Sequence, residues 1–492
     1  MSAEPAARPA ADVTGAQSSP SKAAPPKPAS MPPNPSLLKR LSRGLKSSLA
    51  LVQEAAFGLG GVGRHPIPRA PAGSRTWLYT VREPELIREV LAGRAGDFPK
   101  SRLMRSMLSD LIGDSVFVAN GETWRWRRAI VDQALEQARV RDVMEQMRAA
   151  ADALADRIEA QLGAAGEAVV RVDIEATHFA ADVIFRTLFS EPIADEDAAR
   201  IVRAFERYQG VAYAHGMLRL ARLPVDLFPG ALKRRRSARA IRAVLEKPLR
   251  RRLDALAAGG EAPSSDILAS LIACADPETG RRFGPDELLD EVAMLFLAGH
   301  ETSASALGWA LYLLAVAPAA QDQVHAEARA VLGERPAAFA DMKALAFTRN
   351  VFREALRLYP PVAQIARDST AREHMCGHDV APGAVVFCPP WILHRQPRFW
   401  TDPDAFVPDR FETEPGREAA RQAYFPFSLG PRVCPGAAFA LQEATLALAM
   451  LTRRFAFAPV EGREPEPVGR LTLRSGNGVA LEIRRRRPVP LH

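Results

Sequence analysis

The sequence predicts a mainly α-helical fold with small β-sheets, organised as one large domain. Long segments in which apolar residues recur at helical spacing fill most of the chain beyond residue 60. Short β-like runs occur near residue 80, between residues 360 and 430, and near the C-terminal end. No Pro/Ser-rich linker and no internal repeat follows residue 60, so we expect a single domain, although 492 residues would accommodate about three domains of typical size.

The N-terminal segment differs in composition from the rest of the chain. Residues 1–35 contain nine prolines and many alanines and serines, which predicts a disordered leader. Residues 36–59 are expected to form a basic amphipathic lead-in helix, and the main domain is expected to span residues 60–492. The lead-in helix has two interpretations: it packs on the domain, or it makes peripheral contact with a membrane.

The expected elements of the domain have local signals at their ends. In chain order we expect a strand at 75–81, helices at 84–91, 140–162 and 170–188, a less regular basic stretch at 205–235, helices at 288–316 and 343–358, a strand at 384–388, a helix at 439–455 and a hairpin at 471–483. The helix that ends at residue 358 should stop before Pro360 and Pro361, because proline disfavours helix in the preceding residue. The run Ser-Gly-Asn-Gly at 475–478 favours the hairpin turn.

Composition limits the class of protein. Hydrophobic residues make up 47% of the chain and charged residues 25%, which excludes a wholly disordered chain. The formal net charge of +8 would suit a nucleic acid, an acidic protein partner or an anionic membrane. No nucleic-acid recognition motif accompanies this charge, so we expect no nucleic-acid partner.

Membrane and redox signals are weak. The chain has no run of 18 or more apolar residues and no apolar signal-peptide region, so we expect no transmembrane segment and a cytoplasmic location, with peripheral membrane contact as the alternative role of residues 36–59. The four cysteines form neither a CxxC motif nor a zinc-like spacing with histidine. Free thiols are therefore expected, with Cys434 as the exception.

A ten-residue segment around Cys434 carries the strongest chemical signal. Residues 427–436 have the pattern Phe-x-x-Gly-x-Arg-x-Cys-x-Gly. A thiolate that ligates iron must be deprotonated and surrounded by backbone N–H donors, and glycines permit the tight turn that aims those donors at sulfur. Gly436 precedes a helix whose N-terminal dipole favours a nearby thiolate. Cys434 is therefore the candidate metal ligand.

A second motif, Ala-Gly-His-Glu-Thr-Ser at 298–303, lies midway along the apolar segment 288–316. An acid and an alcohol inside an apolar helix are costly unless they have partners or a function. The hydroxyl of Thr302 can donate to the carbonyl four residues earlier, and Gly299 can let the helix distort locally. Taken alone, Glu301 and Thr302 would equally suit an N-cap or a surface turn.

The two motifs together resemble those of the cytochrome P450 family, which has matching cysteine-loop and acid–alcohol patterns. The resemblance implies that Cys434 ligates haem iron and that Phe427 packs beside the ligand loop. It implies that Thr302 and Glu301 relay protons to iron-bound dioxygen. It also implies that Ala298, on the same helical face as Thr302, touches haem or substrate.

Other motifs match the same family in the same order. Glu354 and Arg357 form a Glu-x-x-Arg pair on one helical face. The resemblance adds Arg410, within Phe-Val-Pro-Asp-Arg-Phe, to make a buried structural triad that holds the cysteine loop. These three residues are expected to support haem incorporation rather than chemistry.

Further residues are expected to bind the haem propionates. Trp124 and Arg128 lie four residues apart, and in the family this pair meets a propionate, for which arginine supplies bidentate geometry. Arg432 and Arg367 are the other propionate candidates. The alternative for Trp124 and Arg128 is a cation–π pair on the surface.

The resemblance covers about residues 60–485 and implies a single cytochrome P450 fold around a buried haem. The implied activity is that of a haem-thiolate monooxygenase that inserts one oxygen atom from O2 into an apolar organic substrate. The cofactor would be haem b (iron protoporphyrin IX), whose axial cysteine thiolate favours O–O cleavage. Fatty acid, terpenoid, carotenoid and aromatic substrates all remain open. The alternatives are a haem-thiolate peroxygenase or isomerase, and a non-catalytic haem-binding protein.

Electrons are expected to come from outside the chain. Only 58 residues follow Cys434, too few for a reductase domain, so we expect separate partners that carry electrons ultimately from NAD(P)H. By resemblance these are a ferredoxin with ferredoxin reductase, or a flavoprotein reductase. The candidate basic face for an acidic partner consists of Arg125, Arg127, Arg453 and Arg454. Substrate specificity is expected to come from residues 101–120, 205–230, 295–298, 362–365 and 475–477.

Overall fold

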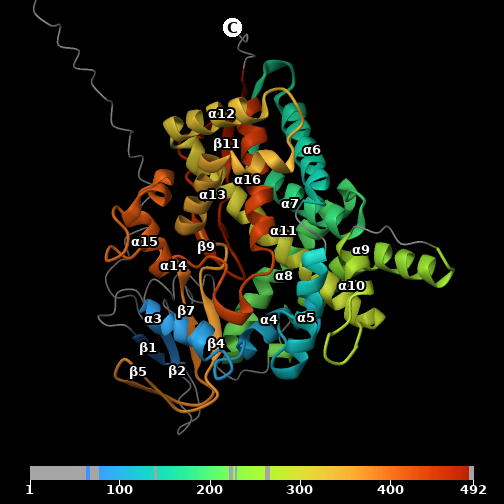
Figure 1. Ribbon diagram of the computed structural model, residues 1–492, viewed down its shortest axis with the longest axis vertical. Helices are drawn as coiled ribbons and strands as arrows, with labels where there is room; N and C mark the ends of the chain where they lie inside the picture. The colour runs from blue at the N-terminus through green and yellow to red at the C-terminus, as the bar shows by residue number, and fades with distance from the viewer. Residues whose placement is uncertain are drawn as a thin grey trace, which may run out of the picture.

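The computed structural model describes residues 62–66, 77–137, 141–220, 225–227, 230–260 and 266–486. The expected leader over 1–35 and lead-in helix over 36–59 lie outside these residues. The expectation of a mainly helical fold with small sheets is confirmed (Figure 1). Within the described ranges no single helix is both long and apolar enough to cross a bilayer, and the one pair that qualifies jointly, Pro285–Ala315 with Pro318–Leu332, is bent by 110°.

The helices make up most of the described residues. They are α3 (Pro84–Arg88), α4 (Arg102–Ile112), α5 (Gly121–Gln137), α6 (Met144–Leu162), α7 (Val172–Phe189), α8 (Asp195–Leu220), α9 (Gly230–Ala257), α10 (Ile267–Ala273), α11 (Pro285–Ala315), α12 (Pro318–Leu332), α13 (Ala346–Leu358), α14 (Pro390–Leu393), α15 (Glu414–Ala423) and α16 (Ala437–Arg454). Short turns of other helical types are η1 (Glu89–Gly93), η2 (Gly163–Ala165), η3 (Val225–Leu227), η4 (Phe339–Lys343), η5 (Pro408–Glu412) and η6 (Gly430–Arg432).

The strands form small separate sheets. One sheet has the order β1-β2-β7-β4 and consists of β1 (Val62–Pro66), β2 (Trp77–Val81), β7 (Val385–Cys388) and β4 (Ile365–Asp368), with β2 and β7 parallel. A second has the order β3-β11-β8, from β3 (Glu167–Arg171), β11 (Ala480–Arg485) and β8 (Phe455–Pro459). Two pairs complete the set: β5 (Glu373–Met375) with β6 (His378–Val380), and β9 (Pro467–Gly469) with β10 (Leu473–Ser475).

Helix α11 is the longest helix among the described residues, and local chemistry explains where it begins. Pro285 occupies the first turn, where its missing N–H costs nothing. The carboxylate of Glu287 accepts a hydrogen bond from the backbone N–H of Gly284, at 3.0 Å. Most side chains of α11 are buried, which explains the long apolar run seen in the sequence.

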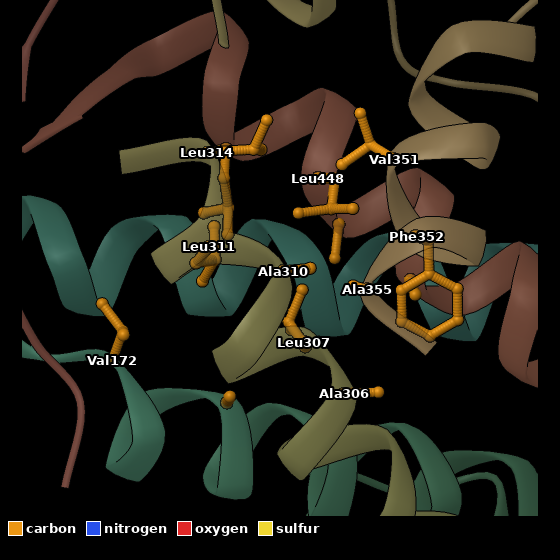
Figure 2. Close-up of a cluster of buried hydrophobic side chains, with 14 of the residues drawn as sticks. Val172, Ala306, Leu307, Ala310, Leu311, Leu314, Val351, Phe352, Ala355 and Leu448 are labelled. Atoms are coloured by element: carbon orange, nitrogen blue, oxygen red, sulfur yellow. The ribbon is translucent and has the colours of Figure 1, made fainter. Parts of the chain in front are cut away.

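One part of the core lies where α7, α11, α13 and α16 meet (Figure 2). Leu307 and Leu311 of α11 pack in the same cluster as Phe352 and Ala355 of α13 and Leu448 of α16. Each fully buried side chain of leucine or phenylalanine size contributes about 1.5–3 kcal/mol. This packing joins α11 to α16, the helix that follows the cysteine loop.

Three sequence predictions about elements are wrong. The segment 471–483 is no hairpin, because β10 pairs with β9 whereas β11 pairs with β3 and β8; buried Leu481 and Ile483 direct β11 to those strands. The described part of the stretch expected to be irregular at 205–235 is largely helix, since Phe205 and Tyr208 of α8 are buried while Arg203 and Arg207 are exposed. The helix expected over 170–188 begins only at Val172, after the strand β3.

Candidate functional site

The cysteine loop is held by its own backbone in front of α16. The N–H of Cys434 donates to the carbonyl of Phe427 at 2.9 Å, and the N–H of Val433 donates to the carbonyl of Gly430 at 3.0 Å. Gly430 has φ of +71°, and a Cβ there would lie 2.4 Å from the carbonyl oxygen of Leu91. Only glycine allows this close approach to η1, which is why the pattern requires it.

The thiol of Cys434 is exposed even though atoms of the fold crowd around it. That crowding raises the pKa of the Cys434 thiol by desolvation. The backbone N–H of Gly436 and the charges of Arg128 and Lys100 act in the opposite direction. A metal cation on the sulfur would add the positive charge that makes the thiolate the stable form.

Four cations from separate elements gather beside the cysteine loop. Lys100, before α4, interacts electrostatically with Arg367 of β4, Arg432 of η6 and Arg128 of α5, as well as with Cys434. Burial, reinforced by these neighbours, lowers the pKa of Lys100 well below its usual value and lowers the pKa of Arg432 to about 10. These lowered pKa values reflect first the burial of the two groups and second the like charges close to them.

This cation cluster has little counter-charge of its own. Among the described residues, Asp132 is the one carboxylate hydrogen-bonded to any member, at 2.7 Å from Nε of Arg128. The side chains of Arg367 and Arg432 donate instead to backbone carbonyls and to the amide of Asn120. Buried like charges are costly without an anion nearby. The donor set therefore fits a ligand that carries two carboxylates, such as the propionates of haem.

An aromatic side chain completes the cluster. Trp124 of α5 is half-buried, and the guanidinium of Arg432 lies 4.4 Å from the centroid of its ring. Arg128, one turn later on α5, donates to the carbonyl of Val433 at 3.0 Å. The tertiary structure therefore brings Trp124, Arg128 and Arg432 together next to Cys434.

The central helix presents an accessible face in its middle. Ala298 is exposed and Thr302 half-exposed, although most of α11 is buried. The hydroxyl of Thr302 donates to the carbonyl of Ala298 at 2.7 Å, as the sequence predicts. The helix continues through Gly299 without interruption, so no break opens there. Gly299 instead allows close packing on α7, since a Cβ would lie 3.0 Å from Ile184.

Glu301 does not share the environment of its neighbour Thr302. It is buried, and its carboxylate accepts hydrogen bonds from the hydroxyl of Thr472 at 2.5 Å and from Nε of Arg474 at 2.6 Å. Arg474 also pairs with the second carboxylate oxygen. Because these partners come from the segment around β10, Glu301 faces the C-terminal part of the chain.

Two other residues of the motif 298–303, His300 and Ser303, are also buried. His300 packs against Phe205 and Phe296, and burial lowers the pKa of its imidazole. Ser303 lies 3.5 Å from the carboxyl of Glu443 on α16, and burial raises the pKa of Glu443 well above its usual value. Glu443 therefore faces the central helix from α16, the helix that follows Cys434.

The expected triad is present and fully buried. Glu354 and Arg357 of α13 form two parallel hydrogen bonds of 2.8 Å, and Nε of Arg410 donates to Glu354 at 2.8 Å. Burial alone would raise the pKa of Glu354, but the two guanidinium groups outweigh it and hold that pKa below its usual value. The carboxylate is therefore ionised and doubly paired.

The triad reaches the cysteine loop through one histidine. Arg357 donates to the carbonyl of His394 at 2.8 Å, and Nε2 of His394 accepts from the N–H of Phe425 at 3.0 Å. Phe425 in turn accepts from the N–H of Ser428, inside the loop. Burial lowers the pKa of His394 to about 3, so the imidazole is neutral and able to accept. This chain of bonds connects α13 to the residues before Cys434.

Comparison with known proteins identifies the family. A profile of the family described as Cytochrome P450 matches residues 65–480.

This chain belongs to the cytochrome P450 family. A relative from Streptomyces melanosporofaciens, cyclooctatin synthase, is 33% identical over 81% of this chain and 84% of its own length. Cyclooctat-9-en-7-ol 5-monooxygenase from the same organism is 30% identical over 78% of this chain and 81% of its own. Human cytochrome P450 4V2 is 28% identical over 81% of this chain and 78% of its own.

Solved structures agree with the assignment. The crystal structure of the cytochrome P450DA heme domain superposes with a TM-score of 0.75 and 26% identity, covering 87% of this chain and 90% of that one. The chain is thus a P450 monooxygenase with a single large P450 fold, and haem-thiolate and O2 chemistry come with the family.

The P450 structure corrects the predicted basic face. Arg127 is buried and pairs with Glu291 at 2.7 Å, so it is no surface charge. Arg453 and Arg454 lie in the last turn of α16, about 25 Å along the helix from its Cys434 end. Only Arg125 stays exposed near the loop. The burial of Arg127 could not be predicted from the sequence, because helical spacing alone does not tell which face of α5 is buried.

Four site residues of this P450 were missed from the sequence. They are Lys100, His394, Thr472 and Arg474. None has a neighbouring motif that assigns its role, since each reaches the site from another part of the chain. The pattern Arg-x-Thr-x-Arg at 470–474 is the local signal for Thr472 and Arg474, and it is too common to assign them a role.

Proposed function

We propose that Cys434 supplies the axial thiolate to the iron of haem b, and that the cation cluster binds its propionates. The supporting observation is the position of Cys434 beside Lys100, Arg128, Arg367 and Arg432 with a single carboxylate among them. Haem bound there supplies the activation of O2 that inserts one oxygen atom into a substrate. Trp124 and Phe427, both half-buried, would pack at the edges of the ring.

Residues of α11 would bound the reacting side of the cofactor. Ala298 leaves room because its side chain is small, and Thr302 places a hydroxyl on the same face. Because the hydroxyl of Thr302 donates its hydrogen to the carbonyl of Ala298, the oxygen lone pairs of Thr302 stay free to accept a hydrogen bond from a proton donor. Glu301, held by Thr472 and Arg474, would connect this point to the solvent.

For the substrate we propose a terpenoid. The support is twofold: one relative is named as a monooxygenase of cyclooctat-9-en-7-ol, and several apolar side chains stay partly exposed next to the core. These side chains are Phe117, Met217, Leu297, Val362 and Leu471. A fatty acid is the competing class, because Nζ of Lys100 lies 3.4 Å from the ring centroid of Phe117.

We further propose that electrons reach the haem from a separate acidic partner, a ferredoxin with its reductase or a flavoprotein reductase, and ultimately from NAD(P)H. Arg125 is the one exposed candidate that remains near the cysteine loop. Exchange of Arg125 for Glu should slow partner-driven reduction and leave dithionite reduction unchanged. Equal effects on both would argue against docking at this face.

The reduced, CO-bound protein tests the cofactor proposal. We expect the strongly red-shifted Soret band of thiolate-ligated haem, and we expect Cys434→Ala to abolish it. Cys388→Ala is the matched control, because Cys388 is fully buried in β7. A haem-loaded protein without the shifted band would refute the thiolate assignment.

The role of Thr302 has its own test. Thr302→Ala should leave the CO spectrum intact and divert electrons from product to peroxide or water. Full coupling in the variant would contradict the proton-relay role. Spin-state titration with terpene alcohols, fatty acids and aromatics then ranks the substrate classes, and tightest binding by a fatty acid would overturn the terpenoid proposal.

A further inference from the structure

The segment between α4 and α5, residues 113–120, forms a compact strap. The N–H of Ser115 donates to the carbonyl of Ile112, and the carbonyl of Ser115 accepts from the N–H groups of Val118 and Ala119 at 3.1 Å. Ser115 is fully buried. These hydrogen bonds fold the strap into consecutive turns, so one short stretch of backbone connects its two ends.

One end of the strap is bonded to two adjacent carboxylates of α11. The N–H of Asp114 donates to Asp290 at 3.1 Å. The N–H of Val116 donates to both oxygens of Glu291, at 3.0 and 3.2 Å. Gly113 approaches so closely that a Cβ there would lie 2.0 Å from the Asp290 carboxylate.

The same two carboxylates also bind side chains of other helices. Arg127 of α5 donates to Glu291 at 2.7 Å, and Arg242 of α9 donates to Asp290 at 2.7 Å. Arg242 also donates to the carbonyl of Leu111. Glu291 has no exposed surface, and burial raises its pKa to about 7 even though Arg127 and the N–H of Val116 favour the charged form.

The other end of the strap holds two members of the cation cluster. Arg432 donates to the carbonyl of Ala119 at 3.1 Å and to the side-chain oxygen of Asn120 at 2.7 Å. Asn120 also exchanges two hydrogen bonds with the backbone of Lys100. The strap therefore joins the acidic pair on α11 to cations beside Cys434.

We propose that Asp290 and Glu291 are positioning residues that place the strap 113–120 and, through it, Arg432 and Lys100. The inference rests on the proposed binding of haem carboxylates by these cations. Asp290 and Glu291 lie in the N-terminal half of α11 and do not touch the cation cluster, yet they would help the protein to retain haem. Amide hydrogens in α11 and α5 provide internal references for its test.

The first test breaks the contact from the strap side. Gly113→Ala places a methyl group on the Asp290 carboxylate, whereas Gly121→Ala, also at positive φ (+59° against +53°), meets nothing within 4 Å. In the ferric protein we expect Gly113→Ala to speed amide exchange over 114–119 by about tenfold and haem transfer to apomyoglobin several-fold. Gly121→Ala should change both by less than about threefold. Equal effects of the two variants would overturn the proposal.

The second test acts from α11 and does not depend on the first. At a pH above 8, where Glu291 with its pKa of about 7 is mostly ionised, Glu291→Gln removes the carboxylate that accepts from Val116. Glu287→Gln removes a partly exposed partner of the same Arg127 that does not contact the strap. Only Glu291→Gln should speed strap exchange and haem transfer. Unchanged haem transfer with a mobile strap would refute the link to Arg432. A normal CO spectrum in all four variants keeps this outcome separate from the thiolate assignment.

Discussion

Two buried groups of arginines in this P450 differ in how their charges are balanced. In the triad, Arg357 and Arg410 share the carboxylate of Glu354 and direct their remaining donors to backbone carbonyls. In the cation cluster, Lys100 and Arg367 lie close together without a hydrogen-bonded carboxylate from the described residues.

The comparison separates a structural site from a binding site. A buried charge network that is satisfied within the protein stabilises the fold and needs no ligand. A group of cations with unmatched charge destabilises the free protein, and binding of an anion offsets that cost. Substitutions in the triad should therefore mainly lower the free energy of unfolding, whereas substitutions in the cation cluster should mainly weaken haem binding.

The largest effect is expected from Glu354→Gln. It leaves two buried guanidinium groups without their shared anion, which costs about 3–5 kcal/mol. Urea unfolding and the yield of folded protein measure this loss. Glu418→Gln is the control, because the side chains of Glu418 and its partner Arg421 are 49% and 60% exposed, so a much smaller loss is expected. Equal losses would mean that the triad has no special structural role.

The second-largest effect is expected from acid, which weakens the triad. The pKa of Glu354 is held below its usual value, so its contribution to stability is complete above about pH 4.5 and is lost as pH falls through the folded-state pKa. Arg410→Met removes one cation, which raises the pKa of Glu354 and moves the acid-induced loss to higher pH. If that pKa rises by about one, the carboxylate contributes about 1.4 kcal/mol less to stability at neutral pH. Urea titrations between pH 7 and pH 4 test this, and an unmoved onset would contradict it.

The cation cluster should show the opposite pattern. Arg367→Met removes a buried cation that has no carboxylate partner among the described residues, so the unfolding free energy of the apoprotein should change by less than about 1 kcal/mol or rise. Loss of a charged hydrogen bond to a haem carboxylate, worth about 1.5–3 kcal/mol, should weaken haem binding at least tenfold. Haem transfer to apomyoglobin measures this. If Arg367→Met lowered the stability of the apoprotein as much as Glu354→Gln does, the distinction between the triad and the cation cluster would be wrong.

The smallest effect on the stability of the apoprotein is expected from Arg128→Gln. Arg128 pairs with Asp132 one turn later on α5, and Asp132 is about half exposed. Such a pair contributes about 0.3–0.5 kcal/mol and weakens with salt. Thermal unfolding in low and high salt should therefore differ little from that of the native chain. A loss above about 2 kcal/mol would place Arg128 with the triad instead.

Local motifs explain why much of the site was predictable. The cysteine loop and the Glu-x-x-Arg pair need residues at fixed short spacing, and the bond from Thr302 to Ala298 follows from helical geometry alone. The end of α13 at Leu358 was predictable for the same reason, because Pro360 and Pro361 follow directly and disfavour helix.

Contacts between distant segments explain what was missed. The expected hairpin at 471–483 failed because β10 and β11 each found a partner elsewhere, and strand pairing depends on which strands are available. Arg127 was assigned to a surface face because the sequence could not tell that Glu291, 164 residues away, would bury it. Lys100 carries no local signal, and the pair His394-Arg395 fits the family pattern without indicating a role.

By itself, the sequence determined the class of fold, the ligand cysteine as a candidate and the acid–alcohol pair, since each depends on interactions within a few residues. Only the tertiary structure decided which cations meet beside Cys434, that Glu301 faces Thr472 and Arg474, and that the strap 113–120 joins α11 to the cation cluster. The physical reason is that burial and charge balance are properties of the packed chain. A lysine or a carboxylate acquires its role from neighbours that only folding supplies.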